Sequence, residues 1–162
     1  VIIIKMKNII ELKYLISFVV ISSFFPTIAY SENIQSDWLS LKYDKTYLRT
    51  GPSKQHKVLW TYKKIGLPIK KLREKGDWFE VQMPDQETGW INDSQVSKKR
   101  RVIIISNKLV NIYKKDNLNS IVFAKAGKNV IGDLIGCKKV LCKINFYKLE
   151  GYIRKKNIWG ID

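Results

Sequence analysis

Few residues of this 162-residue chain belong to types that commonly do chemistry. There is one histidine, His56, and there are two cysteines, Cys137 and Cys142. This count alone argues against a His/Cys metal cage and against a Ser/His/Asp triad, since the chain has a single imidazole and two thiols. His56 lies in the polar stretch 53–57, typical of an exposed loop, and no serine, cysteine or paired carboxylate near it suggests a general base. The sequence therefore predicts no catalytic residue, no metal site and no cofactor.

The two cysteines are separated by four residues, 138–141. Across a two-residue hairpin, residues five positions apart face each other, so the spacing permits a Cys137–Cys142 disulfide. Export from the cytoplasm would place the pair where disulfides persist. The alternatives are two free buried thiols, or a catalytic or metal role that a distant single histidine supports poorly. We favour the disulfide and keep the alternatives open.

Four acidic residues, Asp77, Glu80, Asp85 and Glu87, lie in and around a predicted hairpin. Carboxylates in such places are usually ordinary turn and surface charges. They can also form an acidic rim that faces a cationic ligand. The sequence leaves both interpretations open.

The chain is strongly basic, with 30 lysines and arginines against 14 acidic residues and a formal net charge of +16. Lysine supplies 25 of these cations, beside 23 isoleucines, a mixture that an AT-rich coding bias also produces. A basic surface attracts anionic polymers and lipid headgroups. Arginine, which makes bidentate contacts to nucleic acids, is scarce, so a nucleic acid partner is not expected. One function class is therefore a basic envelope protein held electrostatically on anionic polymers or lipid headgroups.

Residues 1–31 have the three regions of a secretory signal peptide. Two lysines follow Met6, the candidate true start, and precede an apolar core over 14–25. Pro26 ends any helix, and small residues at positions −3 and −1 predict cleavage after Ser31. The apolar core of about 12 residues is short for a transmembrane helix, which needs about 20. We expect a periplasmic or secreted protein, and the alternative is an uncleaved N-terminal anchor.

After Ser31 the sequence predicts short β-strands separated by turns. An apolar fraction of 45%, with 12% aromatic residues, is too high for a disordered chain. Phe79, Val81 and Met83 alternate with Trp78 and other residues of the opposite face, which predicts a strand with those three toward a core. No window of helical length shows a 3.6-residue period. The expected fold class is all-β.

The same layout occurs twice, at a separation of about 63 residues. The Gly-Trp-Ile of 89–91 returns as Gly-Tyr-Ile at 151–153, and the Phe-Glu-Val of 79–81 returns as Cys-Lys-Ile at 142–144. A charged run at 97–101 separates the two units and is interpreted as a solvated linker that a protease can cut. Units of about 60 residues have small cores. They must therefore pack on each other or close into compact barrels without free edges.

Residues 47–53, Tyr-Leu-Arg-Thr-Gly-Pro-Ser, resemble the opening motif of bacterial SH3 domains. Gly-Asp-Trp-Phe-Glu-Val at 76–81 and Gly-Trp-Ile at 89–91 match the central hairpin and the closing strand of that family. The second unit is similar to the companion repeat of exported bacterial proteins with paired SH3 domains. The resemblance implies two tandem SH3-like β-barrels, over 38–97 and 102–162, after the signal peptide.

The second unit departs from the family at several positions. Tyr152 stands where the family has tryptophan, Leu141 replaces a tryptophan before the second cysteine, and Lys115-Asp116 replaces the Gly-Pro turn. These departures weaken the expectation of a shared ligand site in the second repeat. We therefore expect the first repeat to bind the ligand.

The resemblance implies a non-enzymatic binding or scaffold protein, because SH3 barrels bind extended peptides on an aromatic-lined groove. The expected partner is a peptidoglycan peptide or an envelope protein, with peripheral contact to an anionic membrane surface as a second mode. The predicted ligand-binding residues are Tyr47, Arg49, Trp78 and Trp90. The alternative is that Trp78, Trp90 and Trp159 pack against the neighbouring repeat. Trp159, near the end of the sequence, is interpreted as a structural clasp.

Overall fold

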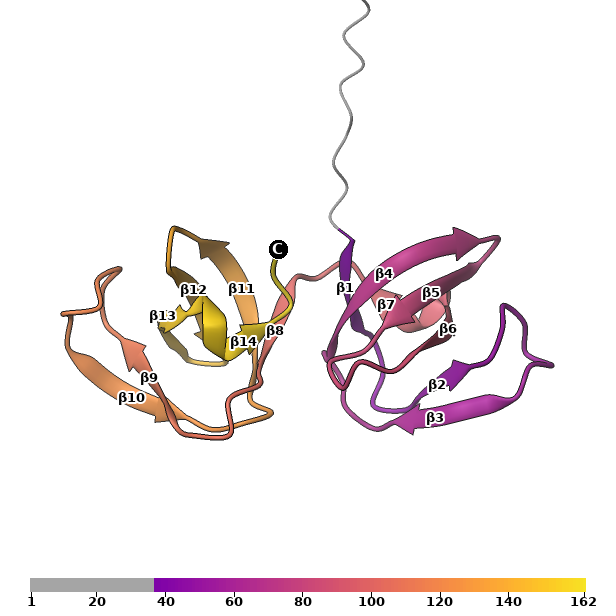
Figure 1. Ribbon diagram of the computed structural model, residues 1–162, viewed down its shortest axis with the longest axis horizontal. Helices are drawn as coiled ribbons and strands as arrows, with labels where there is room; N and C mark the ends of the chain where they lie inside the picture. The colour runs from indigo at the N-terminus through magenta and orange to yellow at the C-terminus, as the bar shows by residue number, and fades with distance from the viewer. Residues whose placement is uncertain (1–36) are drawn as a thin grey trace, which may run out of the picture. The chain divides into compact units, whose positions relative to one another are not determined.

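A computed structural model describes residues 37–162, which form two seven-stranded antiparallel sheets (Figure 1). The predicted signal peptide at 1–31, with its candidate start at Met6, lies outside the described residues. Within residues 37–162, no helix is both long enough and apolar enough to cross a membrane. The structure confirms the all-β fold class, with two SH3-like β units.

Each sheet is built from seven short strands and is accompanied by one turn of 3₁₀ helix. The first contains β1 (Trp38–Leu41), β2 (Thr46–Arg49), β3 (Val58–Tyr62), β4 (Pro68–Lys75), β5 (Trp78–Gln82), β6 (Thr88–Asn92), η1 (Asp93–Gln95) and β7 (Val96–Ser97). The second contains β8 (Arg101–Ile104), β9 (Val110–Tyr113), β10 (Val122–Ala126), β11 (Ile131–Cys137), β12 (Leu141–Phe146), β13 (Leu149–Arg154), η2 (Lys155–Asn157) and β14 (Ile158–Trp159).

The two sheets have the same strand order, β3-β2-β6-β5-β4-β1-β7 and β10-β9-β13-β12-β11-β8-β14. The recurring Gly-Trp-Ile and Gly-Tyr-Ile triplets lie at matching places, in β6 and β13. Each position of one sheet therefore has a counterpart in the other, which allows the two surfaces to be compared residue by residue.

The inward faces of the strands follow the predicted alternation. In β5 and the residue after it, Val81 and Met83 are fully buried, and Phe79 packs against the same cluster. Trp78 and Glu80 face the other way and stay half-buried. Because side chains of a strand point alternately to its two faces, the apolar alternation selected the buried face.

Two separate clusters of apolar side chains form the cores. The first contains, among others, Leu48, Ile69, Val81 and Ile91, and the second contains Val110, Ile144 and Ile153. Ile103 of β8 belongs to the first cluster although its strand belongs to the second sheet. The second sheet therefore contributes to the core of the first.

Glycine recurs in the two triplets because strands pass close together there. A Cβ atom on Gly89 would lie 2.8 Å from the carbonyl oxygen of Arg49 and 2.8 Å from Leu48 Cγ. A Cβ atom on Gly151 would lie 2.3 Å from Ile112 Cγ2, the side chain that corresponds to Leu48. Only glycine leaves room for the inward side chain of the neighbouring strand at this point.

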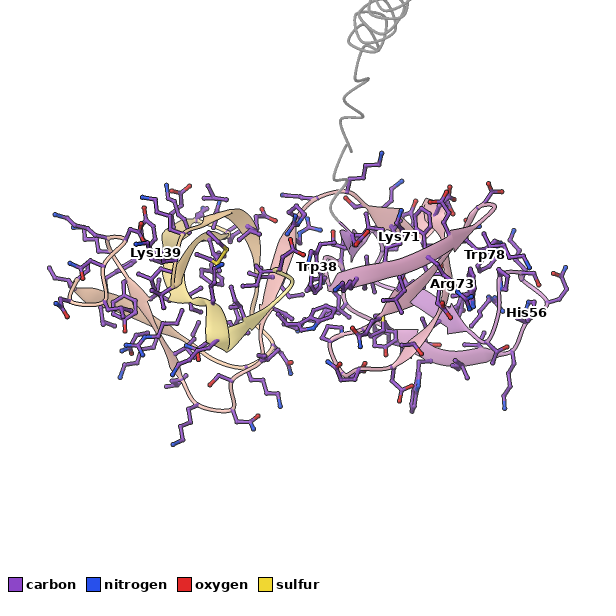
Figure 2. The ribbon with its side chains drawn as sticks, turned by 45° about the horizontal axis from the view of Figure 1, so that its top comes forward. Trp38, His56, Lys71, Arg73, Trp78 and Lys139 are labelled. Carbon is purple, nitrogen blue, oxygen red and sulfur yellow. A yellow bond between two sulfur atoms is a disulfide. The ribbon has the colours of Figure 1, made fainter. Side chains whose placement is uncertain are left out.

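Aromatic side chains join the two barrels. The rings of Trp38 and Trp159 meet edge to face with centroids 4.6 Å apart (Trp38 is labelled in Figure 2). Trp38 Nε1 also donates a hydrogen bond to Asp162 Oδ1 at 2.8 Å. Trp159 packs against the first core cluster. This arrangement agrees with the interpretation of Trp159 as a clasp.

The charged run 97–101 is less solvated than the sequence suggested. Its Lys98 and Lys99 are exposed, but Arg101 is the first residue of β8 and is only partly exposed. Arg101 Nε pairs with Asp133 Oδ1 at 3.0 Å, and its Nη1 donates to Ser40 Oγ at 3.2 Å. The solvated-linker prediction is therefore wrong at Arg101, because a partner from each barrel holds its guanidinium.

Candidate functional site

Four outward-facing side chains form a row across the first sheet. The register pairs Arg49 of β2 with Trp90 of β6, Trp90 with Glu80 of β5, and Glu80 with Arg73 of β4. Neighbouring strands lie about 4.8 Å apart, so side chains in such a row contact one another. Two of the four predicted ligand residues, Arg49 and Trp90, belong to this row.

Trp90 faces outward but is only 7% exposed, which corrects the expectation of an accessible indole. The guanidinium carbon of Arg73 lies 5.4 Å from the centre of the indole ring. Arg73 in turn forms an ion pair with Glu80, whose hydrogen bond and charge raise the pKa of Arg73. The guanidinium of Arg73 therefore lies over the Trp90 ring, and strands β2 and β5 lie on either side of β6, which carries Trp90.

The sequence interpretation overlooked Arg73. The signal that could have found it is the hairpin itself, because the turn at 76–77 places Arg73 opposite Glu80 across the two strands. Opposite charges on facing cross-strand positions attract each other. Figure 2 shows Arg73, Trp78 and His56 on the part of the first barrel farther from Trp38.

Arg49 mainly braces the loop that follows β2. Its Nη1 donates to the carbonyl oxygens of Lys54 at 3.0 Å and His56 at 2.8 Å. Its guanidinium carbon also lies 5.6 Å from the ring centre of Tyr47. Arg49 therefore shapes the loop beside the row, while other nitrogens of its guanidinium remain available to a ligand.

Tyr47 and Trp78 are both half-buried. Two cations contact the ring of Tyr47, with Lys45 Nζ 5.4 Å and the guanidinium carbon of Arg49 5.6 Å from its centre. Trp78 begins β5, where the register pairs it with Lys75 and Asn92. Trp159 packs against the first barrel, as the packing alternative expected, whereas the ring contact between the barrels in residues 37–162 joins Trp159 to Trp38 and not to Trp78.

His56 is exposed in its loop, as expected, but a serine does lie beside it. Ser53 Oγ and His56 Nδ1 are 2.6 Å apart, so these two side chains of the stretch 53–57 contact each other. Among the hydrogen bonds and ion pairs of residues 37–162, none gives the other ring nitrogen a carboxylate partner. Within residues 37–162 the pair therefore lacks the acidic third group that orients the imidazole in a Ser/His/Asp triad.

The imidazole instead helps to wall a shallow cleft beside the row. A Cβ atom on Gly51 would lie 2.4 Å from the His56 ring, so the ring rests directly on that glycine. The cleft has a volume of about 380 Å³, and His56, Pro52, Arg73 and Trp90 line it. It is open to solvent, and its size suits a side chain or a short peptide segment.

The corresponding row of the second sheet has different chemistry. Its members are Tyr113, Tyr152, Lys143 and Gly136. Gly136 occupies the place of Arg73, and a Cβ atom there would have no neighbour within 4 Å. Lys143 replaces Glu80 and pairs with Glu150 at 2.9 Å. The second row thus lacks the arginine–glutamate pair that covers the tryptophan of the first.

The structure contains the Cys137–Cys142 disulfide that the hairpin spacing favoured. The two cysteines are register partners across β11 and β12. Cys142 is fully buried in the second core cluster, whereas Cys137 is exposed. The bond ties the end of the hairpin to the core.

No group of three or more histidine, cysteine, aspartate or glutamate residues within 37–162 is arranged to hold a metal ion. The described site therefore consists of aromatic rings, guanidinium groups and a carboxylate. Such groups bind peptides and sugars through stacking, hydrogen bonds and ion pairs.

Comparison with known proteins identifies the first unit. Residues 42–98 match the family described as the bacterial SH3 domain. The first barrel is therefore similar to bacterial SH3 domains. This result confirms the resemblance that the Tyr-Leu-Arg-Thr-Gly-Pro-Ser motif indicated, and the row described above lies on the surface of the matched barrel.

Similar solved structures include two proteins from Trichomonas vaginalis. NlpC2 is 14% identical with a TM-score of 0.35, covering 76% of this chain and 48% of its own, and NlpC1 is 13% identical with a TM-score of 0.35, covering 80% and 48%. An NlpC/P60 family protein from Bacillus cereus is 12% identical with a TM-score of 0.34, covering 75% and 55%. The chain thus spans about half the length of these proteins. No curated protein sequence matches the chain.

Proposed function

We propose that this protein is exported and binds the bacterial cell wall as a non-enzymatic SH3 module. The observation that carries the proposal is the match of residues 42–98 to the bacterial SH3 domain, together with the aromatic and charged outer row on that barrel. SH3 barrels bind extended peptides along aromatic-lined surfaces. The proposed ligand is a wall peptide, and the proposed export signal is the segment 1–31.

The residues proposed to contact this ligand are Tyr47, Arg49, Trp78 and Trp90. The half-buried rings of Tyr47 and Trp78 offer apolar surface that a peptide can cover at little cost in side-chain entropy. Arg49 and Arg73 provide donors for carboxylates. The buried Trp90 contributes the floor beneath Arg73 rather than an exposed face.

The test is co-sedimentation of the purified chain with peptidoglycan sacculi. Truncating an aromatic anchor of an interface commonly costs 2 kcal/mol or more, so Trp78→Ala is expected to weaken binding by about thirtyfold. Trp60→Ala is the matched control, because Trp60 is 53% exposed on β3 and lies outside the row. Equal sedimentation of a folded Trp78→Ala variant and the parent would refute this assignment of the site.

A second candidate function is electrostatic retention on anionic envelope polymers or lipid headgroups. The observation that favours it is the charge of the second barrel, where residues 102–162 contain 12 lysines and arginines but four acidic residues. All four carboxylates are engaged, Asp116 with Lys138, Asp133 with Lys99 and Arg101, Glu150 with Lys143 and Asp162 with Trp38. Most lysines of this barrel therefore have no anionic partner among the described residues.

Salt separates the two candidates. Contacts between exposed charges are screened within about 10 Å at 0.1 M salt and about 3 Å at 1 M, whereas contacts in an aromatic cleft are screened much less. Sedimentation that survives about 0.5 M salt and depends on Trp78 supports the SH3 proposal. Sedimentation that is lost at this salt and is insensitive to Trp78→Ala supports electrostatic retention.

A further inference from the structure

A groove of about 420 Å³ lies where the two barrels meet, away from the outer row. Leu67, Pro84 and Ile103 provide apolar surface in it, and Leu67 and Ile103 are themselves buried in the first core cluster. Ligand sites in proteins occur preferentially at junctions between domains, where apolar walls meet a few convergent polar groups. The question is which chemistry the polar groups of this groove complement.

The lining of the groove includes a carboxylate held by a phenol. Tyr62 donates its hydroxyl to Asp85, at 3.2 Å from Oδ1 and 3.0 Å from Oδ2. Burial of the half-buried ring raises the pKa of Tyr62, and the hydrogen bond and charge of Asp85 raise it further, so the phenol stays protonated. Asp85 also accepts a hydrogen bond from the backbone N–H of Glu87 at 3.3 Å. It forms no ion pair with any residue in 37–162.

The lining of the groove also includes two ammonium groups. Lys64 Nζ donates to the carbonyl oxygen of Asn129 at 2.6 Å, and Lys128 Nζ donates to Asn107 Oδ1 at 2.7 Å. Both acceptors are neutral, and neither lysine forms an ion pair within the described part of the chain. The hydrogen bonds hold the two cations in place without neutralising them.

The groove is shaped before any ligand arrives. Lys64 comes from the first barrel and Asn129 from the second, so their hydrogen bond crosses the groove wall. The Trp38–Trp159 contact and the Arg101 hydrogen bond to Ser40 join the same two barrels. A preorganised site loses less conformational entropy on binding than a flexible one.

We propose that this groove binds a short aliphatic peptide that carries one free carboxylate and one free ammonium group. The carboxylate faces Lys64 and Lys128, the ammonium faces Asp85, and the aliphatic part lies on Leu67 and Ile103. The proposal for the groove rests on the proposed function in one respect, since wall peptides are the source of such a ligand. The chemistry of the site does not depend on the outer row, and its test is separate.

The experiment is isothermal titration calorimetry of residues 32–162 with Nα-acetyl-Lys-D-Ala-D-Ala, which has one ammonium and one carboxylate. Two matched probes each lack one charge, the first with an amidated C-terminus and the second with an acetylated lysine side chain. Hydrogen-bonded contacts to a charged group are worth about 1.5–3 kcal/mol when shielded and less when exposed, so each probe is expected to bind about tenfold more weakly.

Variants assign each charge to its side of the groove. The amidated probe is expected to bind the parent more weakly than the unmodified probe does. The Lys64→Gln/Lys128→Gln variant is expected to bind the two probes equally, because it lacks the cations that the carboxylate contacts. The side-chain-acetylated probe is likewise expected to bind the parent more weakly than the unmodified probe does. The Asp85→Asn variant is expected to bind these two probes equally. The controls are Lys54→Gln and Asp44→Asn, which remove exposed charges outside the groove. This double-mutant cycle isolates the interaction from effects on folding.

The outcomes separate this proposal from the proposed function. Equal affinity of all three probes, no binding of the unmodified probe, or additive losses in the cycle each overturn the groove assignment. If the parent and the Asp85→Asn variant still sediment equally with sacculi, the cell-wall function stands without the groove. If the unmodified probe binds with the expected coupling but sacculi do not sediment the chain, the groove stands and its ligand comes from another source.

Discussion

Asp133 shows how a single carboxylate connects segments that the sequence keeps apart. Lys99 Nζ lies 2.7 Å from Asp133 Oδ2, and Arg101 Nε lies 3.0 Å from Oδ1. Partial burial acts to raise the pKa of Asp133, but the hydrogen bonds and charges of Lys99 and Arg101 outweigh it and lower the pKa below its ordinary value of 3.8. The ionised form is therefore the one that the folded state stabilises.

The sign of this shift predicts a pH dependence. Because the folded pKa is lowered, Asp133 contributes stability above pH 3.8, and this contribution is lost as the pH falls through the folded pKa. Asp133→Asn is expected to lower the free energy of unfolding by about 1 kcal/mol at neutral pH, a small value because the side chain is partly exposed to solvent. Urea unfolding at several pH values tests this, and the parent and the variant should converge in acid. A difference that persists unchanged below the folded pKa would contradict the electrostatic explanation.

At the scale of the strands, the two barrels place equivalent positions in the same geometry and fill them differently. Arg73, Glu80 and Trp90 in the first row correspond to Gly136, Lys143 and Tyr152 in the second. The backbone requirement is shared, since Gly89 and Gly151 both leave room for an inward side chain of the neighbouring strand. Along one strand, the residues that the fold requires therefore alternate with the residues that form the outer surface.

The shared glycines give a prediction at this scale. Gly89→Ala forces its Cβ atom against the carbonyl oxygen of Arg49, which is backbone and cannot rotate away. Overpacking of this kind costs about 1–3 kcal/mol, so the variant is expected to lower the free energy of unfolding by this amount. Gly136→Ala is the matched control, because its Cβ atom meets nothing within 4 Å. Equal denaturation midpoints for the two variants would show that the close approach carries no energetic cost.

For the whole molecule, the second barrel completes the core of the first. Ile103 is a member of the first core cluster, and Ile131 and Trp159 pack against it. The edge-to-face contact of Trp159 with Trp38 adds to this burial. The stability of the first barrel therefore depends on side chains of the second barrel, including Trp159 near the end of the sequence.

This dependence is testable through Trp159. Removing a tryptophan from a core typically costs about 3–5 kcal/mol, and about 2–3 kcal/mol is expected for Trp159→Ala because its ring is only partly buried. Amide hydrogen exchange should show faster exchange in β1 and β4 of the first sheet. Trp60→Ala, which removes a tryptophan that is 53% exposed on β3, should leave these amides unchanged. Faster exchange confined to the second sheet would contradict the shared core.

The fold and the candidate site differ in how far the sequence predicts them. Phe79, Val81 and Met83 could be assigned to the core from the local geometry of a strand. Cys137 could be paired with Cys142 from the local geometry of a hairpin. The exposure of Trp90 could not be predicted in the same way. Its indole is covered by Arg73, which reaches it from β4 across the intervening strand β5.

The amino-acid sequence by itself determined the all-β class, the inward faces and the SH3 motif at 47–53, and it favoured the disulfide pair that the structure contains. These features follow from local rules, since alternation and turn residues act within a few positions of the chain. Only the tertiary structure decided the burial of Trp90, the partners of Arg101 and the groove that unites Asp85 with Lys64 and Lys128. Burial, ion pairing and concavity depend on which distant segments meet, and that meeting is a property of the packed molecule.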